Sequence, residues 1–144
     1  LKREHPMEPR DAIIVEVGLV SAADVHAARD GYRNLCGKLS LLETAEVIRR
    51  AGLFVGIDSG PAHFANALDT YGVLLLGRHL GFERYMPFSR PYVDGDNCEL
   101  IYADGLVGGI AVERVFGAVS RSRERARGGE ARPAFANTSG GVRP

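Results

Sequence analysis

The sequence predicts an α/β domain, a Rossmann-like and mostly parallel sheet with flanking helices. Short apolar runs alternate along the chain with segments that carry helical spacing and helix caps. Two of the runs, at 53–57 and 73–76, are nearly continuous in apolar residues, which is typical of strands covered on both faces. Hydrophobic residues make up 45% of the 144 residues, enough for the core of one domain.

The first predicted strand covers residues 12–17, where the run Ala-Ile-Ile-Val-Glu-Val is rich in β-branched side chains. Ser21 and Asp24 then have the spacing of a helix N-terminus, with an acid three residues after the cap. This helix is expected to run to about residue 30, and a short strand is expected over 32–36.

The next helix has a capping box in its full form, Ser40 followed by Glu43. Apolar residues recur after it at helical spacing, so we expect a helix over 41–51 that Gly52 ends. The strand over 53–57 follows directly.

A turn is predicted over 58–61, with Pro61 at the start of a helix, where its missing N–H costs nothing. That helix continues over 62–68, and the strand over 73–76 comes next. We therefore expect a third strand–helix–strand unit, and parallel strands as a result.

The remaining residues are less regular. Residues 78–97 contain glycines and prolines without a clear period, and a loop of that length is usually functional or mobile. A last strand is expected over 98–103 and a last helix over 107–119, weakened by its glycines. From residue 128 the composition predicts disorder.

The expected organisation is a lead-in loop over 1–10, one domain over 11–120 and a basic tail without fixed structure over 121–144. The arginines of 121–132 would suit anionic lipid at the inner membrane, but a fraying helix end that becomes a solvated tail is the favoured interpretation because acids are interspersed. Because the chain is short and its first residue is not Met, we expect it to be a fragment.

The composition also argues against several classes. The 18 basic and 18 acidic residues balance, so no nucleic-acid partner is expected. No apolar run is long enough to cross a membrane, and the N-terminus does not resemble a signal peptide, so we expect a cytoplasmic protein. Cys36 and Cys98 match neither a zinc spacing nor a disulfide framework, and the four histidines form no close cluster, so no metal is expected.

The segment with recognisable chemistry is the turn after the strand at 53–57. There a buried strand ends at Asp58, a tight turn passes through Ser59 and Gly60, and a helix begins at Pro61. The first N–H groups of that helix have no partners within it and, with the helix dipole, suit an anion. Gly60 lets a phosphate approach its backbone, and Ser59 offers a hydroxyl.

Two side chains add to this turn. A carboxylate would repel a nearby phosphate, so Asp58 is expected to accept hydrogen bonds from sugar hydroxyls or from the N–H groups of its own turn. His63 lies within the first helical turn and is expected to face the same ligand. The alternative on the local motif alone is an ordinary strand-to-helix turn, in which Asp58 caps its own backbone and His63 is a surface or core histidine with its hydrogen bonds satisfied.

The run from Asn34 to about Gly77 closely resembles the C-terminal domain of family-nine glycosyltransferases, the heptosyltransferase-like group. The resemblance rests on Gly-Lys-Leu-Ser-Leu at 37–41, the helix and apolar strand that follow, and Asp-Ser-Gly-Pro-Ala-His at 58–63. It implies the C-terminal half of a GT-B fold, in which two Rossmann-like domains enclose the active site.

The resemblance also implies a function. The chain would bind a nucleotide-diphosphate sugar, often ADP-heptose, for metal-independent, inverting transfer to a lipopolysaccharide core or similar glycan. No cofactor other than this donor is implied. The chain would supply the donor-binding half, with an N-terminal domain and a glycan or glycolipid acceptor as partners, in the cytoplasm or peripheral at the inner membrane.

Site residues follow by position. Ser59 and Gly60, with Pro61 in the same turn, would meet the diphosphate, and Asp58 the donor sugar. His63 would line the cleft. The nucleobase would border Lys38 and Leu39, although a solvated loop lysine is an equally good interpretation of Lys38. Arg78 would bind phosphate through its fork of donors or be a plain surface arginine.

The sequence departs from the family pattern in several places. The Gly-Gly-Pro-like turn and its acid are replaced by Val17–Asp24, where Asp24 substitutes for the acid or simply caps a helix. The family's Gly-Pro-Thr is replaced by Gly77-Arg78-His79, and an upstream lysine for the phosphates has no equivalent. The acceptor domain with its carboxylate base is absent, so the catalytic residues are unassigned and we expect donor binding without efficient turnover.

Two alternatives stay open at this point. A nucleotide-sugar epimerase of the same architecture has a related turn, but it usually continues with a second glycine and acidic residues, whereas this chain continues with Pro61, Ala62 and His63. A truncated, non-catalytic nucleotide-sugar-binding module is the second alternative, which weak or absent binding would favour.

Overall fold

Parallel strand pairing dominates the computed structural model, which describes residues 12–20, 31–78 and 91–128. Every strand pairing within these ranges is parallel, as predicted. The elements in chain order are β1 (Ile14–Glu16), β2 (Tyr32–Asn34), α1 (Leu41–Arg50), β3 (Phe54–Ile57), α2 (Gly60–Ala67), β4 (Gly72–Leu76), β5 (Cys98–Tyr102), the 3₁₀ helix η2 (Val107–Gly109) and α3 (Val112–Gly128).

The strands form two hydrogen-bonded groups instead of one continuous sheet. β1 pairs with β2, and β3, β4 and β5 form a second sheet in that order. β4 is the central strand of the larger sheet, and four of its five residues are buried. Its neighbours are less covered, and β3 alternates half-buried and exposed residues.

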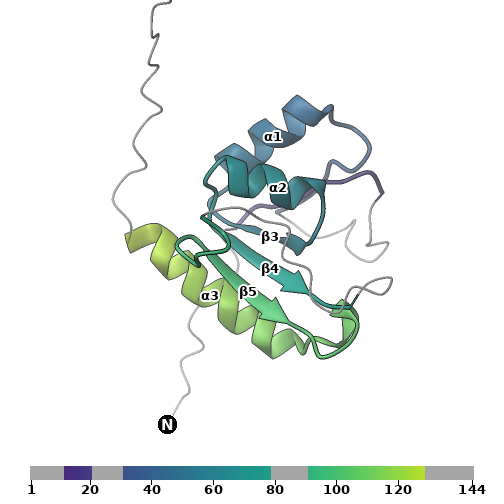
Figure 1. The fold of residues 1–144 in the computed structure, drawn as a ribbon. Helices are drawn as coiled ribbons and strands as arrows, with labels where there is room; N and C mark the ends of the chain where they lie inside the picture. Colours follow the sequence, from purple (N-terminus) through teal and green to yellow (C-terminus); the bar gives the residue numbers. More distant parts are fainter. Residues whose placement is uncertain (1–11, 21–30, 79–90, 129–144) are drawn as a thin grey trace, which may run out of the picture.

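Helices cover both faces of the larger sheet, as expected of a Rossmann-like arrangement. α1 and α2 lie on one face and α3 on the other (Figure 1). The first core cluster includes Ile48 of α1, Ala62 and Ala65 of α2, and Leu74 of β4. The second is centred on Val73, Ile101 and Ala118, between the sheet and α3. The core therefore lies in two layers around β4.

The capping box predicted for α1 is confirmed. The Ser40 hydroxyl accepts from the Glu43 N–H at 3.3 Å, and the Glu43 carboxylate accepts from the Ser40 N–H at 2.8 Å. The helix ends at Arg50 with Ala51 as its C-cap, one residue earlier than predicted. Local cap chemistry was therefore sufficient to place this helix.

The prediction for the last helix was wrong at both ends. Residues 107–109 form only a short 3₁₀ turn, and α3 begins at Val112, because the consecutive glycines 108 and 109 favour irregular backbone. α3 then continues to Gly128, so the first eight residues of the predicted tail, 121–128, are helical. Arg121 and Arg125 reach residues at the edge of the sheet, and these contacts hold the charged helix end in place.

The described end of the predicted long loop packs into the core. Tyr92 is fully buried, and its hydroxyl donates to the Thr70 carbonyl at 2.5 Å. Its N–H donates to the side-chain oxygen of Asn66, a buried residue of α2, at 3.1 Å. Tyr92 and Asn97 of this segment are therefore buried, and sequence periodicity gave no sign of this.

Several predictions lie outside the described residues. These are the lead-in loop over 1–10, the helix over 21–30 with Asp24, residues 79–90 of the long loop, and the tail from 129. Among the helices that the structure describes, none is long and apolar enough to cross a membrane.

Tyr92→Phe should lower the free energy of unfolding by about 1–3 kcal/mol, because the Thr70 carbonyl loses its buried donor. Chemical denaturation of the purified chain would measure the change. Tyr71→Phe is the matched control, because the Tyr71 hydroxyl makes no hydrogen bond to a described residue. Equal effects of the two substitutions would contradict this role of Tyr92.

Acid titration should show that Glu46 loses its charge at an unusually low pH. Hydrogen bonds from Arg49 and then Arg50 lower the pKa of Glu46 from 4.5 to about 2. The carboxylate's contribution to stability is therefore fully present above pH 4.5, and it is lost as the pH falls from 4.5 towards 2. Carboxyl-carbon NMR would show this directly. A Glu46 midpoint near 4.5 in the folded chain would show that the two arginines are not bound to it in solution.

Candidate functional site

Loops from three neighbouring strands leave the larger sheet at its carboxyl edge. Because β3, β4 and β5 are parallel, residues 58–63, 77–78 and 103–109 all follow strand ends on the same edge. In open α/β sheets, ligands bind beyond the carboxyl ends of the strands. A ligand site is therefore expected at this edge.

The start of α2 leaves backbone donors available. Ser59 is the N-cap residue in extended conformation, and its side chain makes no capping hydrogen bond. The Ser59 carbonyl accepts from the Ala62 N–H at 3.0 Å and the His63 N–H at 3.3 Å. The N–H groups of Ser59 and Gly60 have no hydrogen-bond partner among the described residues, so they are the donors that a ligand would meet first.

Gly60 occupies open space at this helix start. It is exposed, its φ is not positive, and an added Cβ would meet no atom within 4 Å. Neither packing nor backbone conformation therefore requires glycine here. A remaining reason for glycine at this position is that a residue without a side chain lets a ligand reach the backbone. The Ser59 hydroxyl, predicted as a ligand donor, donates to the Ile57 carbonyl at 3.1 Å in this structure.

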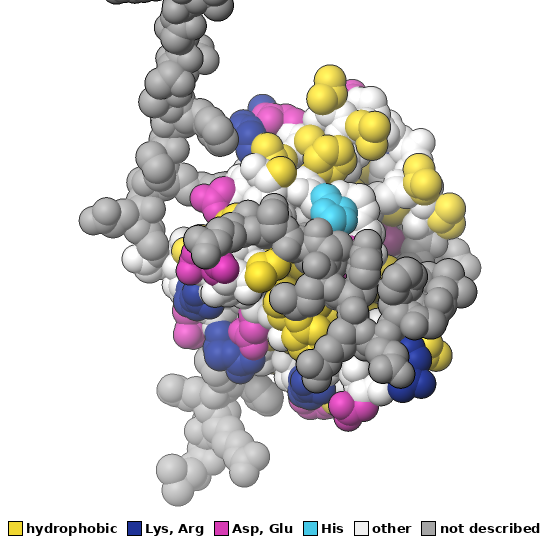
Figure 2. All heavy atoms as spheres, in the orientation of Figure 1, with side chains coloured by type: hydrophobic (Ala, Val, Ile, Leu, Met, Phe, Trp, Pro, Cys, Tyr) yellow, Lys and Arg dark blue, Asp and Glu magenta, His cyan; other side chains and the backbone are white. Residues whose placement is uncertain are grey.

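Asp58 and His63 lie on opposite sides of the turn and approach each other. The His63 Nε2 atom is 3.8 Å from Asp58 Oδ1, and the side chains are 49% and 25% exposed. Figure 2 shows a histidine, cyan, on the molecular surface, and His63 is the histidine within the described ranges. The two side chains that the sequence assigned to the ligand are therefore together, and both reach solvent.

Lys38 and Leu39 lie in the loop that follows β2 of the smaller sheet. The Lys38 ammonium donates to the Asn34 carbonyl at 2.8 Å. Their loop is joined to the loop after β1 by the Gly37 N–H, which donates to the Gly18 carbonyl at 2.8 Å. Lys38 is exposed, which fits both interpretations from the sequence, a solvated loop lysine and a residue that borders the nucleobase.

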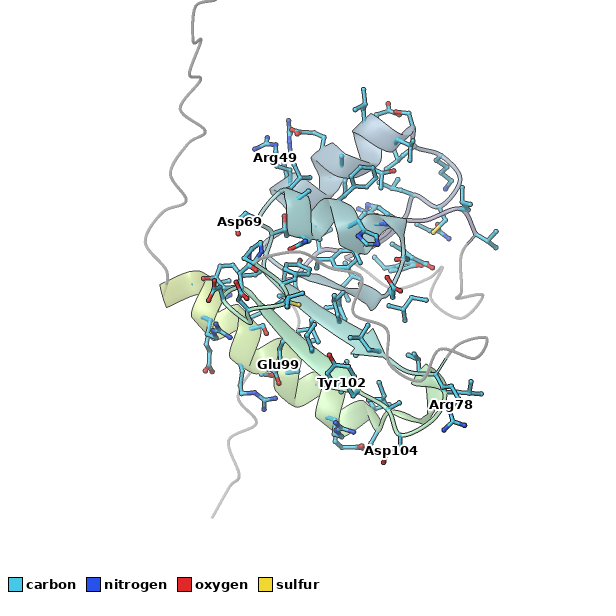
Figure 3. All side chains as sticks on the ribbon, viewed as in Figure 1. Arg49, Asp69, Arg78, Glu99, Tyr102 and Asp104 are labelled. Carbon is cyan, nitrogen blue, oxygen red and sulfur yellow. The ribbon has the colours of Figure 1, made fainter. Side chains whose placement is uncertain are left out.

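Arg78 follows β4 and projects outward at the carboxyl edge (Figure 3). Its N–H donates to the Gly105 carbonyl at 2.7 Å, which ties this loop to the one after β5. At the preceding Gly77, an added Cβ would come within 2.7 Å of the Val107 nitrogen and 2.8 Å of the Gly105 oxygen. Gly77 is therefore required by a close approach of two backbones.

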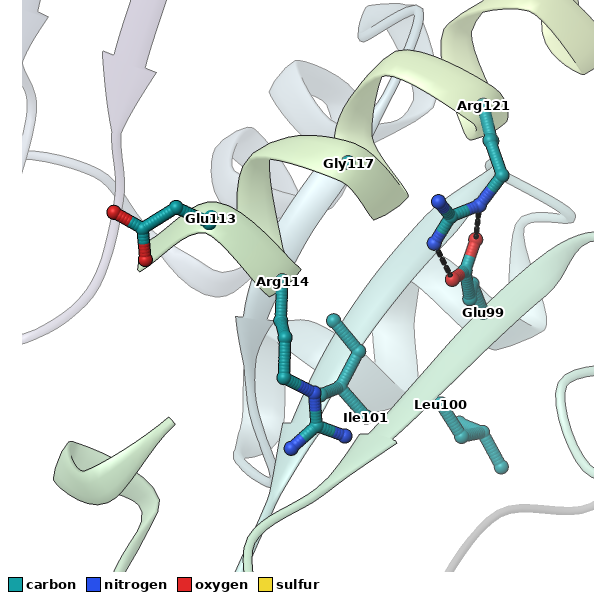
Figure 4. Close-up of a pocket in the computed structure, with 7 residues that line it drawn as sticks. All are labelled: Glu99, Leu100, Ile101, Glu113, Arg114, Gly117 and Arg121. Carbon is teal, nitrogen blue, oxygen red and sulfur yellow. Dashed lines mark hydrogen bonds and ion pairs between the residues drawn. The ribbon is translucent and has the colours of Figure 1, made fainter. Parts of the chain in front are cut away.

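Sequence reasoning missed the loop after β5. Ala103, Asp104 and Gly105 line a hollow of about 470 Å³ together with η2 glycines and Arg114. A second hollow of about 270 Å³ lies between β5 and α3, lined by residues including Glu99 and Arg121 (Figure 4). Neither of these two hollows is lined by residues 58–63. The glycines at 105, 108 and 109 were the only sequence signal of this loop.

The cysteines are poor candidates for nucleophiles. Burial raises the pKa of Cys98 to about 12, so its thiol stays protonated. Burial and the Glu16 carboxylate also raise the pKa of Cys36. Within residues 12–20, 31–78 and 91–128, no group of three or more His, Cys, Asp and Glu side chains is placed to hold a metal ion.

Comparison with known protein families matches residues 17–90 to glycosyltransferase family 9 (heptosyltransferase). The matched region contains the start of α2 and all the site residues predicted from the sequence. No curated protein and no solved structure gives a significant match.

Two glycines at the carboxyl edge should respond differently to alanine. Gly77→Ala should lower the free energy of unfolding by about 1–3 kcal/mol, because the new methyl group overlaps the 105–107 backbone. Gly60→Ala should stay within about 0.5 kcal/mol of the parent chain, since its Cβ enters open space. Thermal or denaturant unfolding of both variants measures this. A large loss of stability for Gly60→Ala would give that glycine a structural role.

Proposed function

Because the chain belongs to glycosyltransferase family 9, the heptosyltransferase family, we propose that it binds the diphosphate of a nucleotide-sugar donor at the start of α2. The observation that carries this proposal is the pair of N–H groups at Ser59 and Gly60, which have no partner in the described chain. Backbone donors at a helix N-terminus are suited to phosphate by both geometry and dipole.

This position also suits the chemistry of glycosyl transfer. When the bond to the sugar breaks, negative charge accumulates on the leaving diphosphate, and fixed donors that stabilise this charge lower the barrier. The amides are held by β3 on one side and α2 on the other, so they need little rearrangement. Because the Ser59 hydroxyl already donates to Ile57, the backbone is the primary donor in this proposal.

Asp58 and His63 are proposed to bind the sugar side of the donor. The Asp58 carboxylate accepts hydrogen bonds from sugar hydroxyls, and the His63 ring, 3.8 Å away, is a second polar group on the same surface. Each is partly exposed, so a ligand reaches both without moving the core. This arrangement favours a carbohydrate linked to a phosphate over a bare phosphate.

The other predicted residues complete the proposal. Arg78 follows the strand next to β3 and supplies a solvent-exposed guanidinium for a phosphate oxygen. Pro61 shapes the turn that meets the diphosphate, and Lys38 and Leu39 border the nucleobase. The donor is ADP-heptose or a related nucleotide sugar, and the acceptor is a lipopolysaccharide core or similar glycan at the inner membrane, reached by inverting transfer.

Transfer also needs a base for the acceptor hydroxyl, which we assign to a companion domain of a GT-B enzyme. We therefore propose that residues 1–144 bind the donor but turn it over inefficiently. Efficient transfer by the purified chain would contradict this division of labour. Family membership favours the transferase over an epimerase.

A thermal-shift panel of ADP-, GDP- and UDP-linked sugars tests donor binding. One nucleotide sugar should raise the melting temperature progressively with concentration, because only the folded chain binds it. Asp58→Ala should weaken binding of the sugar-linked donor more than of the free nucleoside diphosphate. Gly60→Ala should weaken binding of both, because its methyl group stands where a phosphate approaches the amides.

Gly52→Ala is the matched control. Its Cβ also enters open space, but Gly52 precedes β3 and lies at the opposite end of the strand from α2. Affinity should therefore be unchanged. If no ligand in the panel stabilises the chain, or if Gly52→Ala and Gly60→Ala weaken binding equally, the proposed site is wrong.

A further inference from the structure

The two edges of the larger sheet carry different kinds of side chain. Along β5, three arginines of α3 face the edge: Arg121 pairs with Glu99 through two hydrogen bonds, Arg125 donates to the Asp96 carbonyl at 2.7 Å, and Arg114 donates to the Tyr102 carbonyl at 3.4 Å. Figure 4 shows Arg121 on Glu99 and Arg114 beside β5. Charged side chains that occupy an edge discourage the addition of another strand. β5 is therefore built as an outer edge.

The β3 edge is apolar instead. The Phe54 N–H donates to the Tyr71 carbonyl, next to β4, at 2.8 Å. Because backbone groups alternate sides along a strand, the N–H groups of Val55 and Ile57 point away from β4. Neither has a partner among the described residues. Val55 and Ile57 are 45% and 52% exposed as whole residues, although parallel strands are normally covered on both faces.

β1 has the same property. The Ile14 N–H donates to the Gly31 carbonyl at 2.7 Å, and the Glu16 carbonyl accepts from the Leu35 N–H at 3.0 Å. Ile14 and Glu16 therefore use their backbone groups on the β2 side, and Val15 points its own groups the other way. The Val15 groups have no partner in the described chain, so β1 also presents an open edge.

These two edges belong to the same region of the molecule. Val17, directly after β1, packs against the core cluster that Phe54 of β3 also contacts, yet β1 and β3 share no ladder. Figures 1 and 4 both draw β1, purple, on the side of β3 away from β4. The order across the molecule is therefore β2, β1, an interruption, β3, β4 and β5.

The helical layer has a matching interruption. α3 packs over β4 and β5, and its Arg114, Gly117 and Arg121 flank faces β5. At 3.6 residues per turn, Val112 and Phe116 lie on the opposite flank, towards β3. They are 75% and 58% exposed. The side chains of Val55 and Ile57 pair in register with Val73 and Leu75, which face α3, so all four exposed side chains are on one face of the sheet.

We propose that β1 and β3 receive one further parallel strand, apolar on both faces, followed by a helix that packs beside α3 on Val112 and Phe116. The strand would use the open backbone groups of Val15, Val55 and Ile57, and it would join the two groups of strands into one sheet. The occupant is a strand–helix unit of a polypeptide outside these 144 residues. This inference is independent of the donor proposal.

Two other occupants fit poorly. A strand between β1 and β3 needs two free edges, and every described strand already uses one edge on a neighbour, so a second copy of these ranges offers none. Within the chain, the segments outside the described ranges, 1–11, 21–30, 79–90 and 129–144, contain no continuous β-branched or apolar run typical of such a strand.

The test uses a strand–helix unit taken from the chain itself. Residues 53–69, which contain β3 and α2, are duplicated ahead of Leu1 through a flexible linker of about 20 residues, which gives an effective concentration on the order of millimolar. Amide exchange by NMR is followed at Val15, Val55 and Ile57. These amides should exchange rapidly in the parent chain and at least about tenfold more slowly in the fusion, with a higher unfolding midpoint.

The control fusion carries Val55→Lys and Ile57→Lys in the added copy only, and it should give no protection. Sedimentation of both fusions and of the parent chain establishes the oligomeric state. Protection of these amides in the monomeric parent would overturn the proposal, because the chain would already cover its own edge. Protection that accompanies dimerisation, or an unchanged exchange rate in the monomeric fusion, would overturn it as well.

Discussion

The ladder between β3 and β4 is the constraint on which the rest of the structure depends. It runs in register from Phe54 opposite Gly72 to Ile57 opposite Leu75, and it fixes where both strands end. The start of α2 and the loop at Arg78 are therefore neighbours before any side chain contributes. β4 is enclosed by helices on both faces, and its burial makes this arrangement the least tolerant of change.

The elements that sequence reasoning predicted well are those with local causes. The capping box at Ser40 and Glu43, the apolar run of β3 and the turn at Asp58–Pro61 each depend on residues close together in the chain. The same holds for the site, where Asp58 and His63 come together because one turn separates them. The match to the family covers residues 17–90, which include this region.

The features that were missed have distant causes. Tyr92 is held by Thr70 and Asn66, over twenty residues away, and no periodic pattern announces such a contact. α3 was predicted too short because its charged end looked like a tail, whereas Arg121 and Arg125 belong to the edge of β5. The division of the strands was missed because β1 and β3 have equally good strand sequences, and only coordinates reveal which edges are paired.

The close approach at Gly77 has a further consequence for how the carboxyl edge would respond to evolution. Arg78 is bound through its amide to Gly105, and its neighbour has no room for a methyl group against Val107. The guanidinium is thus carried on a support that two separate loops build jointly. Substitutions around Val107 would therefore re-aim Arg78 from a distance, and under the proposed function they would change ligand preference in related chains without touching the ligand.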